Sequence, residues 1–282
     1  MASNLGCVGL AVADAAELAA LVNAITPDSR SLGRVDGVDV RRWEDPSGAR
    51  LVFGRREDTV VEFLPSFAGR VGGKLRALGR VGPEVARAAV VDAAGDTATR
   101  VVLEVEQRRL LPPEPVAHDV RATITALGVD VAVFDDADAF AASPASLVTA
   151  DVEPGDPPAR YVELGLVWPP RMAAESFVSY GEFVPADEAT AHARLAGAVR
   201  SADVRTVSQT GQRFVAAEVA TAGFEATVCF PADEGEAPPR PGNVLHGTVY
   251  LVASVDLPTA SPSRPLRTPF RGRRRGRGRR PV

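Results

Sequence analysis

The arginines at the C-terminal end of the sequence are the residues with the clearest capacity for chemistry. Nine arginines and no acidic residue lie between Thr259 and Val282. A segment so rich in arginine and glycine cannot build a core, so residues 259–282 are expected to form a disordered tail. Such tails attach to RNA, DNA, anionic lipid or acidic protein surfaces through salt-sensitive contacts, although an extension without a selected role would look the same. The candidate nucleic-acid contacts in the tail are Arg271, Arg273, Arg274, Arg275, Arg277, Arg279 and Arg280.

The charge of the chain is unevenly distributed. The net charge is −4 and the tail contributes nine positive charges, so the preceding body carries about −13. An acidic body with a basic tail indicates a charged partner, or contact between the two parts. Lys74 is the only lysine. With the abundance of Ala, Val, Gly and Pro this indicates a GC-rich genome, so an arginine is not by itself a sign of selected recognition.

A second group of candidate contacts lies in predicted strands of the C-terminal half: Arg194, Arg200, Arg205, Arg213 and Phe214. Single-stranded nucleic acid is bound by positive grooves that contain aromatic side chains for stacking, and these residues would supply both. The alternative is that the arginines form the solvated face of a sheet, with His192 on the same face. The acidic body argues against a large phosphate-binding surface.

The elements that would position these residues are mostly strands. The pattern predicts a mostly β fold with a few short helices (α+β), barrel-like antiparallel sheets and a disordered basic tail. Asp14 followed by Glu17 predicts the start of a helix that ends at Pro27, and Asp136–Ala142 predicts another. The predicted strands are Leu5–Val12, Val38–Trp43, Ala49–Phe53, Thr59–Leu64, Val85–Asp92, Thr99–Glu106, Asp119–Leu127, Val129–Phe134, Tyr161–Trp168, His192–Arg200, Phe214–Thr221, Phe224–Phe230 and Val244–Ala253.

Turn residues with little to bury at Glu153–Pro158 predict a boundary between two regions. We expect an α+β N-terminal region at residues 1–150, a β-rich domain at 151–258 and the tail at 259–282. Cys7 and Cys229 are the only cysteines. One disulfide could form between them, but two thiols in a chain of this length are typical of a cytoplasmic protein. No apolar run approaches the roughly 18 residues that span a bilayer, and the N-terminus has no secretory signal.

The predicted C-terminal strands resemble an OB-fold barrel. Leu195–Val199 looks like its long, bent first strand, in which Gly197 permits the coil, and Thr210–Phe214 is similar to its first hairpin turn. Val215–Thr221 and Glu225–Phe230 would be the middle strands, and Pro241–Leu251 would contain the closing strand. The resemblance implies binding of single-stranded nucleic acid, as OB-folds often do. An ordinary meander or sandwich would give the same pattern.

The N-terminal block looks somewhat like a module of the vicinal oxygen chelate (glyoxalase-like) family. Cys7–Val12 followed by an acid-capped helix is similar to the opening of that module, and Asp45–Gly48 is similar to its late turn. The resemblance implies a metal ligand at each place, and the matching positions hold Cys7 and Val52. Since valine cannot bind a metal, a divalent-metal centre of that type is not expected.

Signals for catalysis are weak elsewhere. His118, His192 and His246 lie in no recognisable motif, and nucleophile-elbow, zinc-protease and dinucleotide-binding signatures are absent. Gly69–Lys74 resembles a phosphate-binding loop in its glycines and lysine, but the spacing is wrong. His246 is expected to donate a local hydrogen bond, and Cys229 to be a small buried side chain. We therefore expect no cofactor, metal or catalytic residue.

Three functions remain open from the sequence. The first is a non-enzymatic cytoplasmic protein that attaches to an anionic polymer, such as single-stranded nucleic acid, through a β-rich body and a basic tail. The second is an assembly subunit whose basic tail docks on acidic protein surfaces. The third is a glyoxalase-like enzyme or small-molecule binder.

Overall fold

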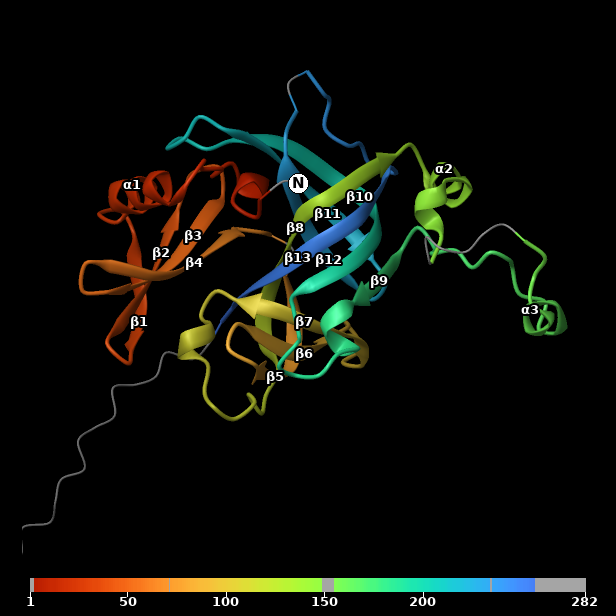
Figure 1. Cartoon of the computed structure of the whole chain (residues 1–282), viewed down its shortest axis with the longest axis horizontal. Helices are drawn as coiled ribbons and strands as arrows, with labels where there is room; N and C mark the ends of the chain where they lie inside the picture. Colours follow the sequence, from red (N-terminus) through yellow and green to blue (C-terminus); the bar gives the residue numbers. More distant parts are fainter. Residues whose placement is uncertain (1–2, 71, 149–154, 234, 257–282) are drawn as a thin grey trace, which may run out of the picture.

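A computed structural model describes residues 3–70, 72–148, 155–233 and 235–256 (Figure 1). Within these residues the strands form a four-stranded sheet and a nine-stranded sheet, accompanied by a few short helices. The mostly β fold predicted from the sequence is therefore confirmed. Residues 257–282, and with them the predicted tail and its arginines, lie outside the described residues.

The small sheet is an antiparallel meander preceded by one helix. The sheet has the order β1 (Arg30–Val35), β2 (Val38–Glu44), β3 (Ala49–Arg56) and β4 (Thr59–Phe67). Helix α1 (Ala15–Ile25) begins as predicted, because the Asp14 side chain accepts hydrogen bonds from the amides of Ala16 and Glu17. The turn between β2 and β3 is also confirmed, with Gly48 at φ +92°, a conformation that glycine adopts without a steric penalty.

The large sheet closes on itself twice. Its strands are β5 (Gly72–Val81), β6 (Val85–Val91), β7 (Thr97–Val105), β8 (Val120–Phe134), β9 (Ser176–Ser179), β10 (His192–Thr206), β11 (Arg213–Thr221), β12 (Phe224–Pro231) and β13 (Val244–Val255). One ring of pairings runs β5–β6–β7–β13–β8 and back to β5, and a second runs β10–β11–β12–β8–β13 and back to β10. Both rings contain β8 and β13, which pair with each other along most of their lengths.

The two rings are built alike. In each half of the sheet three consecutive strands form a meander, and the fourth strand pairs antiparallel with the first. The third strand of each half then pairs in parallel with the fourth strand of the other half, as β7 with β13 and β12 with β8. We call β5–β8 the first half and β10–β13 the second half. One sheet thus takes strands from both sides of the boundary expected near residue 150.

The second ring contains the four strands that the sequence suggested for an OB-like barrel, and its fifth strand is β8. The expectation of antiparallel sheets needs a correction, because β7–β13 and β12–β8 are parallel pairs. Parallel strands need long connections, and here the partners of each pair are far apart in the sequence.

Two buried clusters join the parts. The larger cluster fills the rings with side chains such as Leu75, Leu103, Leu195 and Leu251. The other cluster includes Ile25 from α1, Phe53 from β3 and Phe214 from β11, so the small sheet packs against the large one through it. In Figure 1 the small sheet and α1 lie at one end of the long axis, and α3 (Ala159–Glu163) lies at the other end.

Several predicted elements were wrong. Leu5–Val12 contains a 3-10 helix, η1 (Gly6–Val8), which ends at Gly9 in a left-handed conformation with φ +69°. Tyr161–Trp168 is no strand, because Ala159–Glu163 forms a short helix after Pro158. Asp119–Phe134 holds one long strand where two were predicted, and β1, β5 and β9 were missed. The helix predicted at Asp136–Ala142 is confirmed as α2 (Ala137–Ala142), capped by Asp136.

The short 3-10 helices lie in the connections between these elements. They are η2 (Arg108–Leu110), η3 (Pro144–Ser146) and η4 (Tyr180–Glu182).

Candidate anion-binding cleft

Two cations face each other across neighbouring strands of the first half. Lys74 of β5 lies directly opposite Arg121 of β8 in the antiparallel register. Side chains in such positions have Cβ atoms about 4.5–5.5 Å apart, and like charges there destabilise the sheet. Within the described residues no ion pair links either side chain to an acid. The carboxylate of Asp119, two residues before Arg121, accepts hydrogen bonds from the Arg76 guanidinium at 2.9 and 3.1 Å.

The Asp119 carboxylate bonds Arg76 and also lies within electrostatic reach of Lys74. The hydrogen bonds from Arg76 hold the pKa of the Asp119 carboxyl below its usual value, and the charges of Arg76, Lys74 and His118 lower it further. The repulsion between Lys74 and Arg121 would be relieved by a bound anion, which is the chemistry that this pair of cations fits.

Two further arginines from the small sheet line the same cleft. The buried carboxylate of Glu106 accepts hydrogen bonds from Arg42 at 2.8 Å, from Arg50 at 3.4 Å and from the Ser66 hydroxyl at 2.7 Å. One buried carboxylate thus holds two guanidinium groups. Arg50 also pairs with the exposed Glu44 at 2.8 Å.

Arg42 retains an unused donor. Its side chain is only 9% exposed, and its Nε has no hydrogen-bond partner among the described residues. A buried donor without a partner costs about 1–3 kcal/mol.

The main chain is open on one wall of the cleft. A Cβ atom added at Gly73 would meet nothing within 4 Å, and one added at Gly72 would meet only the Ala122 carbonyl oxygen at 4.0 Å. A ligand can therefore approach the backbone here closely. The cleft has a volume of about 710 Å³ and is lined by Arg42, Arg50, Gly69, Gly72, Gly73, Lys74, Val91, Asp92, Ala93, Gln107, Arg121, Ala122, Thr123, Ser254, Val255 and Asp256. We call it the cationic cleft.

Four cations and two acids line the cationic cleft. Arg42 and Arg50 are paired with Glu106, so the cations left without an ion pair among the described residues are Lys74 and Arg121. One of the two acids, Asp92, accepts hydrogen bonds from the amides of Ala94 and Asp96 at 2.9 Å, so its charge is partly neutralised by its own turn. A phosphate or sulfate group suits such a site, because guanidinium groups bind it by charge-assisted hydrogen bonds.

The cleft lies where the chain continues toward its basic segment. The amide of Asp256, on the rim, donates a hydrogen bond of 2.9 Å to the Arg121 carbonyl oxygen. Gln107 also holds the end of β13, since its side chain bonds both the carbonyl and the amide of Val255. The residues after Asp256 therefore begin at the cationic cleft.

The arginines predicted as contacts in the second half are dispersed. Arg194 and Arg205 are eleven positions apart on β10, which corresponds to roughly 35 Å along a strand. Arg194 donates hydrogen bonds to His246 Nε2 at 3.1 Å and to the carbonyl oxygens of Val148, Ala145 and Leu147 at 3.0, 2.8 and 2.9 Å. Its guanidinium group is thus largely used to hold residues 145–148 against the sheet.

The other predicted contacts lie in different surroundings. Arg200 is exposed and lies 3.8 Å from Glu175, Arg205 pairs with Asp203 at 3.1 Å, and Arg213 is exposed at the start of β11. Phe214 was predicted to stack on a base, but it is completely buried and packs edge-on against Phe67. The burial of Phe214 depends on the small sheet, which the local pattern could not reveal.

The histidine and cysteine predictions have mixed outcomes. His246 accepts a hydrogen bond from Arg194 at Nε2, and no hydrogen bond donated by its other ring nitrogen is found among the described residues. Burial lowers its pKa to about 4, and the charge of Arg194 adds to this effect. Cys229 is buried as predicted. Cys7 and Cys229 are free thiols, and the Cys7 thiol donates to the Gly128 carbonyl oxygen at 3.2 Å.

The structure gives no sign of a metal site or a membrane-spanning helix in the part of the chain that it describes. No group of three or more His, Cys, Asp or Glu side chains there is placed to hold a metal ion. None of the helices among these residues has the length and apolar character needed to cross a membrane.

Most of the cationic cleft was not predicted. Gly69–Lys74 was noted for its glycines and lysine, but its spacing does not fit a phosphate-binding loop, and Gly72–Lys74 in fact begins a strand. Arg42, Arg50 and Arg121 had no local signal, because the fold brings them together from two sheets. Comparison with protein-family models, curated proteins and solved structures finds no match to this chain.

Proposed function

We propose that this protein is a non-enzymatic binding protein that attaches to an anionic polymer, single-stranded nucleic acid, through the cationic cleft and the arginine-rich segment that follows it. The observation that carries the proposal is the Lys74–Arg121 pair. These two cations lie opposite each other without an acidic partner among the described residues, beside Arg42 and Arg50.

The placement of the cleft strengthens the proposal. The nine arginines of residues 259–282 follow in the sequence from Asp256, on the rim of the cationic cleft. We infer that one polymer contacts both the basic segment and the cleft, because Arg264, the first arginine of the segment, follows Asp256 by eight positions. The likeness of the second ring to an OB-fold favours a single strand over a duplex, and the exposed Arg200 and Arg213 remain predicted contacts.

Removal of Arg264–Val282 tests the basic segment. Retention of a single-stranded DNA oligonucleotide at low salt should be abolished or greatly weakened, because all nine arginines of the basic segment are removed. Filter binding or gel shift measures this. Unchanged retention would contradict the proposal.

A second variant tests the cationic cleft. The double substitution Lys74→Gln and Arg121→Gln should weaken retention about tenfold, and should lower the slope of log K against log salt by about 1.4, since each phosphate contact to a single strand contributes about 0.7. The control is Arg56→Gln with Arg240→Gln, which removes the same charge from exposed positions outside the cleft. Equal losses in the two double variants would show that only net charge matters and would exclude the cleft.

The second function considered from the sequence, an assembly subunit whose basic tail docks on acidic protein, is favoured by one observation. Asp130, Asp135, Asp233 and Glu236 line a cleft of about 850 Å³ between β8 and the 231–243 loop. This alternative requires self-association without nucleic acid that disappears at high salt, which light scattering detects.

A further inference from the structure

In the cationic cleft, the two cations without an ion pair lie between two acids. Lys74 of β5 and Arg121 of β8 are register partners, and we call them the cation pair. On the β6 side, Val91 is the other register partner of Lys74, and Asp92 follows it. On the β13 side, the Asp256 amide donates to the Arg121 carbonyl oxygen at 2.9 Å. Asp92 and Asp256 both line the cleft, so an acid borders the cation pair on each side.

Positive charge is also limited along the two strands. Two positions from the cation pair in one direction, Arg76 and Asp119 form an ion pair at 2.9 Å. In the other direction the next residues on the same face are Gly72 and Thr123, which face each other and carry no charge. A protein that follows a nucleic-acid backbone has positive charge along a groove. The cationic cleft concentrates its unpaired charge at one point, so it suits one phosphate group better than a series of them.

The charge at this point matches a phosphomonoester. At pH 7 a phosphomonoester carries a charge of about −1.5 to −2 and has three oxygens that accept strong hydrogen bonds. A phosphodiester within a strand carries a single negative charge. The Cβ atoms of register partners are about 4.5–5.5 Å apart, so Lys74 and Arg121 can contact oxygens of the same phosphate group. A phosphomonoester therefore balances the cation pair, whereas a diester neutralises about half of its charge.

The cleft has room for the nucleotide that carries the phosphate. Its volume is about 710 Å³, within the range of roughly 300–1,000 Å³ that is usual for small-molecule sites. A Cβ atom added at Gly72 would meet only the Ala122 carbonyl oxygen, at 4.0 Å. The space beside Lys74 on the same face of β5 is therefore open. A nucleotide can lie over Gly72 and Thr123 while its phosphate lies at the cation pair.

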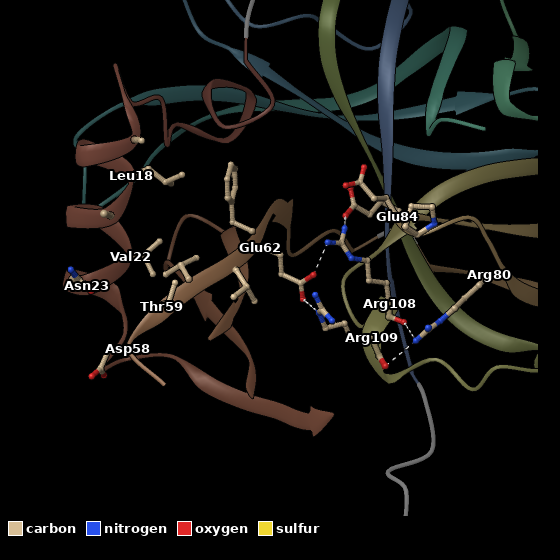
Figure 2. A pocket seen from close by; sticks show the side chains of 17 residues that line it. Leu18, Val22, Asn23, Asp58, Thr59, Glu62, Arg80, Glu84, Arg108 and Arg109 are labelled. Atoms are coloured by element: carbon tan, nitrogen blue, oxygen red, sulfur yellow. Dashed lines mark hydrogen bonds and ion pairs between the residues drawn. The ribbon is translucent and has the colours of Figure 1, made fainter. Parts of the chain in front are cut away.

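A second cleft that contains arginines lacks this feature. Figure 2 shows Glu62 joined to Arg108 and Arg109, at 2.6 and 2.5 Å. Arg80 of the same cleft donates to the main-chain carbonyl oxygens of these two arginines at 2.8 and 2.9 Å. The protein itself thus supplies acceptors to the arginines of this cleft. Within the described residues, the cation pair has no such ion pair, which makes the cationic cleft the better site for an anionic group.

We infer that the cationic cleft binds the terminal phosphomonoester of a single-stranded nucleic acid. The phosphate lies between Lys74 and Arg121, and the terminal nucleotide lies over Gly72. This inference rests on the proposed function and adds that the protein recognises the end of the strand. The basic segment, whose first arginine is Arg264, contacts internal phosphates of the same strand. A strand that ends in a hydroxyl group brings only a diester to the cation pair and binds less tightly.

Oligonucleotides of one sequence with different ends test the inference. One has a phosphate at the 5′ end, one has a phosphate at the 3′ end, and one has hydroxyl groups at both ends. Dissociation constants for the full chain are measured by fluorescence anisotropy, with an internal label and a buffer free of phosphate. At least one phosphorylated oligonucleotide should bind about tenfold more tightly than the hydroxyl-ended one, the effect of one additional hydrogen bond to a charged group.

The pattern of binding separates this inference from the proposed function. A preference for either phosphorylated end supports the inference and identifies which end of the strand supplies the phosphate. Equal binding of all three oligonucleotides would overturn the inference and leave the proposed function intact. Failure of all three to bind would overturn both.

Charge variants locate the preference in the cleft. Lys74→Gln with Arg121→Gln should bind phosphorylated and hydroxyl-ended oligonucleotides equally, because the cation pair is removed. The control, Arg56→Gln with Arg240→Gln, loses the same charge at exposed positions outside the cleft and should keep the preference. The same preference in both double variants would place the recognition of the end elsewhere and overturn the inference.

A neutral variant tests the position of the terminal nucleotide. Gly72→Leu fills the open space beside Lys74 without a change of charge, and the backbone at Gly72 does not have the positive φ that would disfavour a side chain. The variant should lose most of the preference for the phosphorylated end while its Tm stays close to that of the wild type. A full preference in the Gly72→Leu protein would contradict the placement of the nucleotide over Gly72.

Discussion

Lys74 in the first half of the large sheet and Arg194 in the second half occupy similar places. Each is the third residue of the first strand of its half, and each directly precedes a completely buried leucine. Arg194 donates to three carbonyl oxygens of residues 145–148 and to His246. Lys74 instead lies opposite Arg121 in an open cleft. The comparison shows that a cation on a strand is free for a ligand only where the chain does not supply acceptors itself.

The largest expected effect comes from removing the Glu106 carboxylate, which pairs with Arg42 and Arg50. Glu106→Gln should lower the free energy of unfolding by about 3–5 kcal/mol, because Arg42 and Arg50 would lose the buried carboxylate that pairs with them. Chemical denaturation measures the change. Glu44→Gln is the matched control, since it removes only the exposed partner of Arg50. A loss below about 1 kcal/mol, the size expected for an exposed pair, would show that the cationic cleft does not depend on Glu106.

A smaller effect distinguishes the two cations directly. Arg194→Ala should cost about 1–3 kcal/mol, because it leaves carbonyl oxygens of residues 145–148 without donors. Lys74→Ala should be neutral or stabilise the protein by up to about 0.5 kcal/mol in the absence of anions, because it removes a like-charge pair. Thermal unfolding with and without phosphate measures both, and phosphate should raise the Tm of the wild type more than that of Lys74→Ala. Equal losses of stability in Arg194→Ala and Lys74→Ala would contradict the proposed difference between the two cations.

The last prediction is a pH dependence that belongs to the second half. The pKa of His246 is about 4 in the folded protein and about 6.5 in an unfolded chain. The unfolded state therefore binds the proton more readily, so the stability due to neutral His246 is complete above about pH 6.5 and is lost as the pH falls toward 4.

His246→Gln, which keeps an acceptor for Arg194, should flatten this part of the stability profile. Unfolding free energies measured between about pH 7 and about pH 4 compare the variant with the wild type. The difference between the two slopes isolates His246 from other titrating groups. Identical slopes would mean that His246 does not contribute.

Local patterns predicted the elements that local chemistry determines. The Asp14 and Asp136 caps and the Asp45–Gly48 turn follow from neighbouring residues, and all three are present. The strand β5 was missed because its glycines resemble a loop, and the helix at Ala159–Glu163 was missed because its apolar residues resemble a buried strand.

The candidate site could not be predicted in the same way. Arg42 and Arg121 are 79 positions apart in the sequence and belong to different sheets, so no spacing rule connects them. The sequence also favoured the second half as the binding surface, since Arg194 and Arg200 alternate with apolar residues there. Residues 145–148 cover Arg194 on β10, whereas Lys74 on β5 lies in an open cleft. This difference arises from the tertiary structure and has no signal in the local sequence.

The exchange of β8 and β13 between the rings has a consequence for cooperativity. Neither half contains all the strands of its own ring, because β13 completes the first and β8 completes the second. The two rings must therefore form and unfold as one unit. An anion held between Lys74 and Arg121 on β5 and β8 would stabilise the folded state as a whole. Binding in the first half would therefore also raise the free energy of unfolding of the second half.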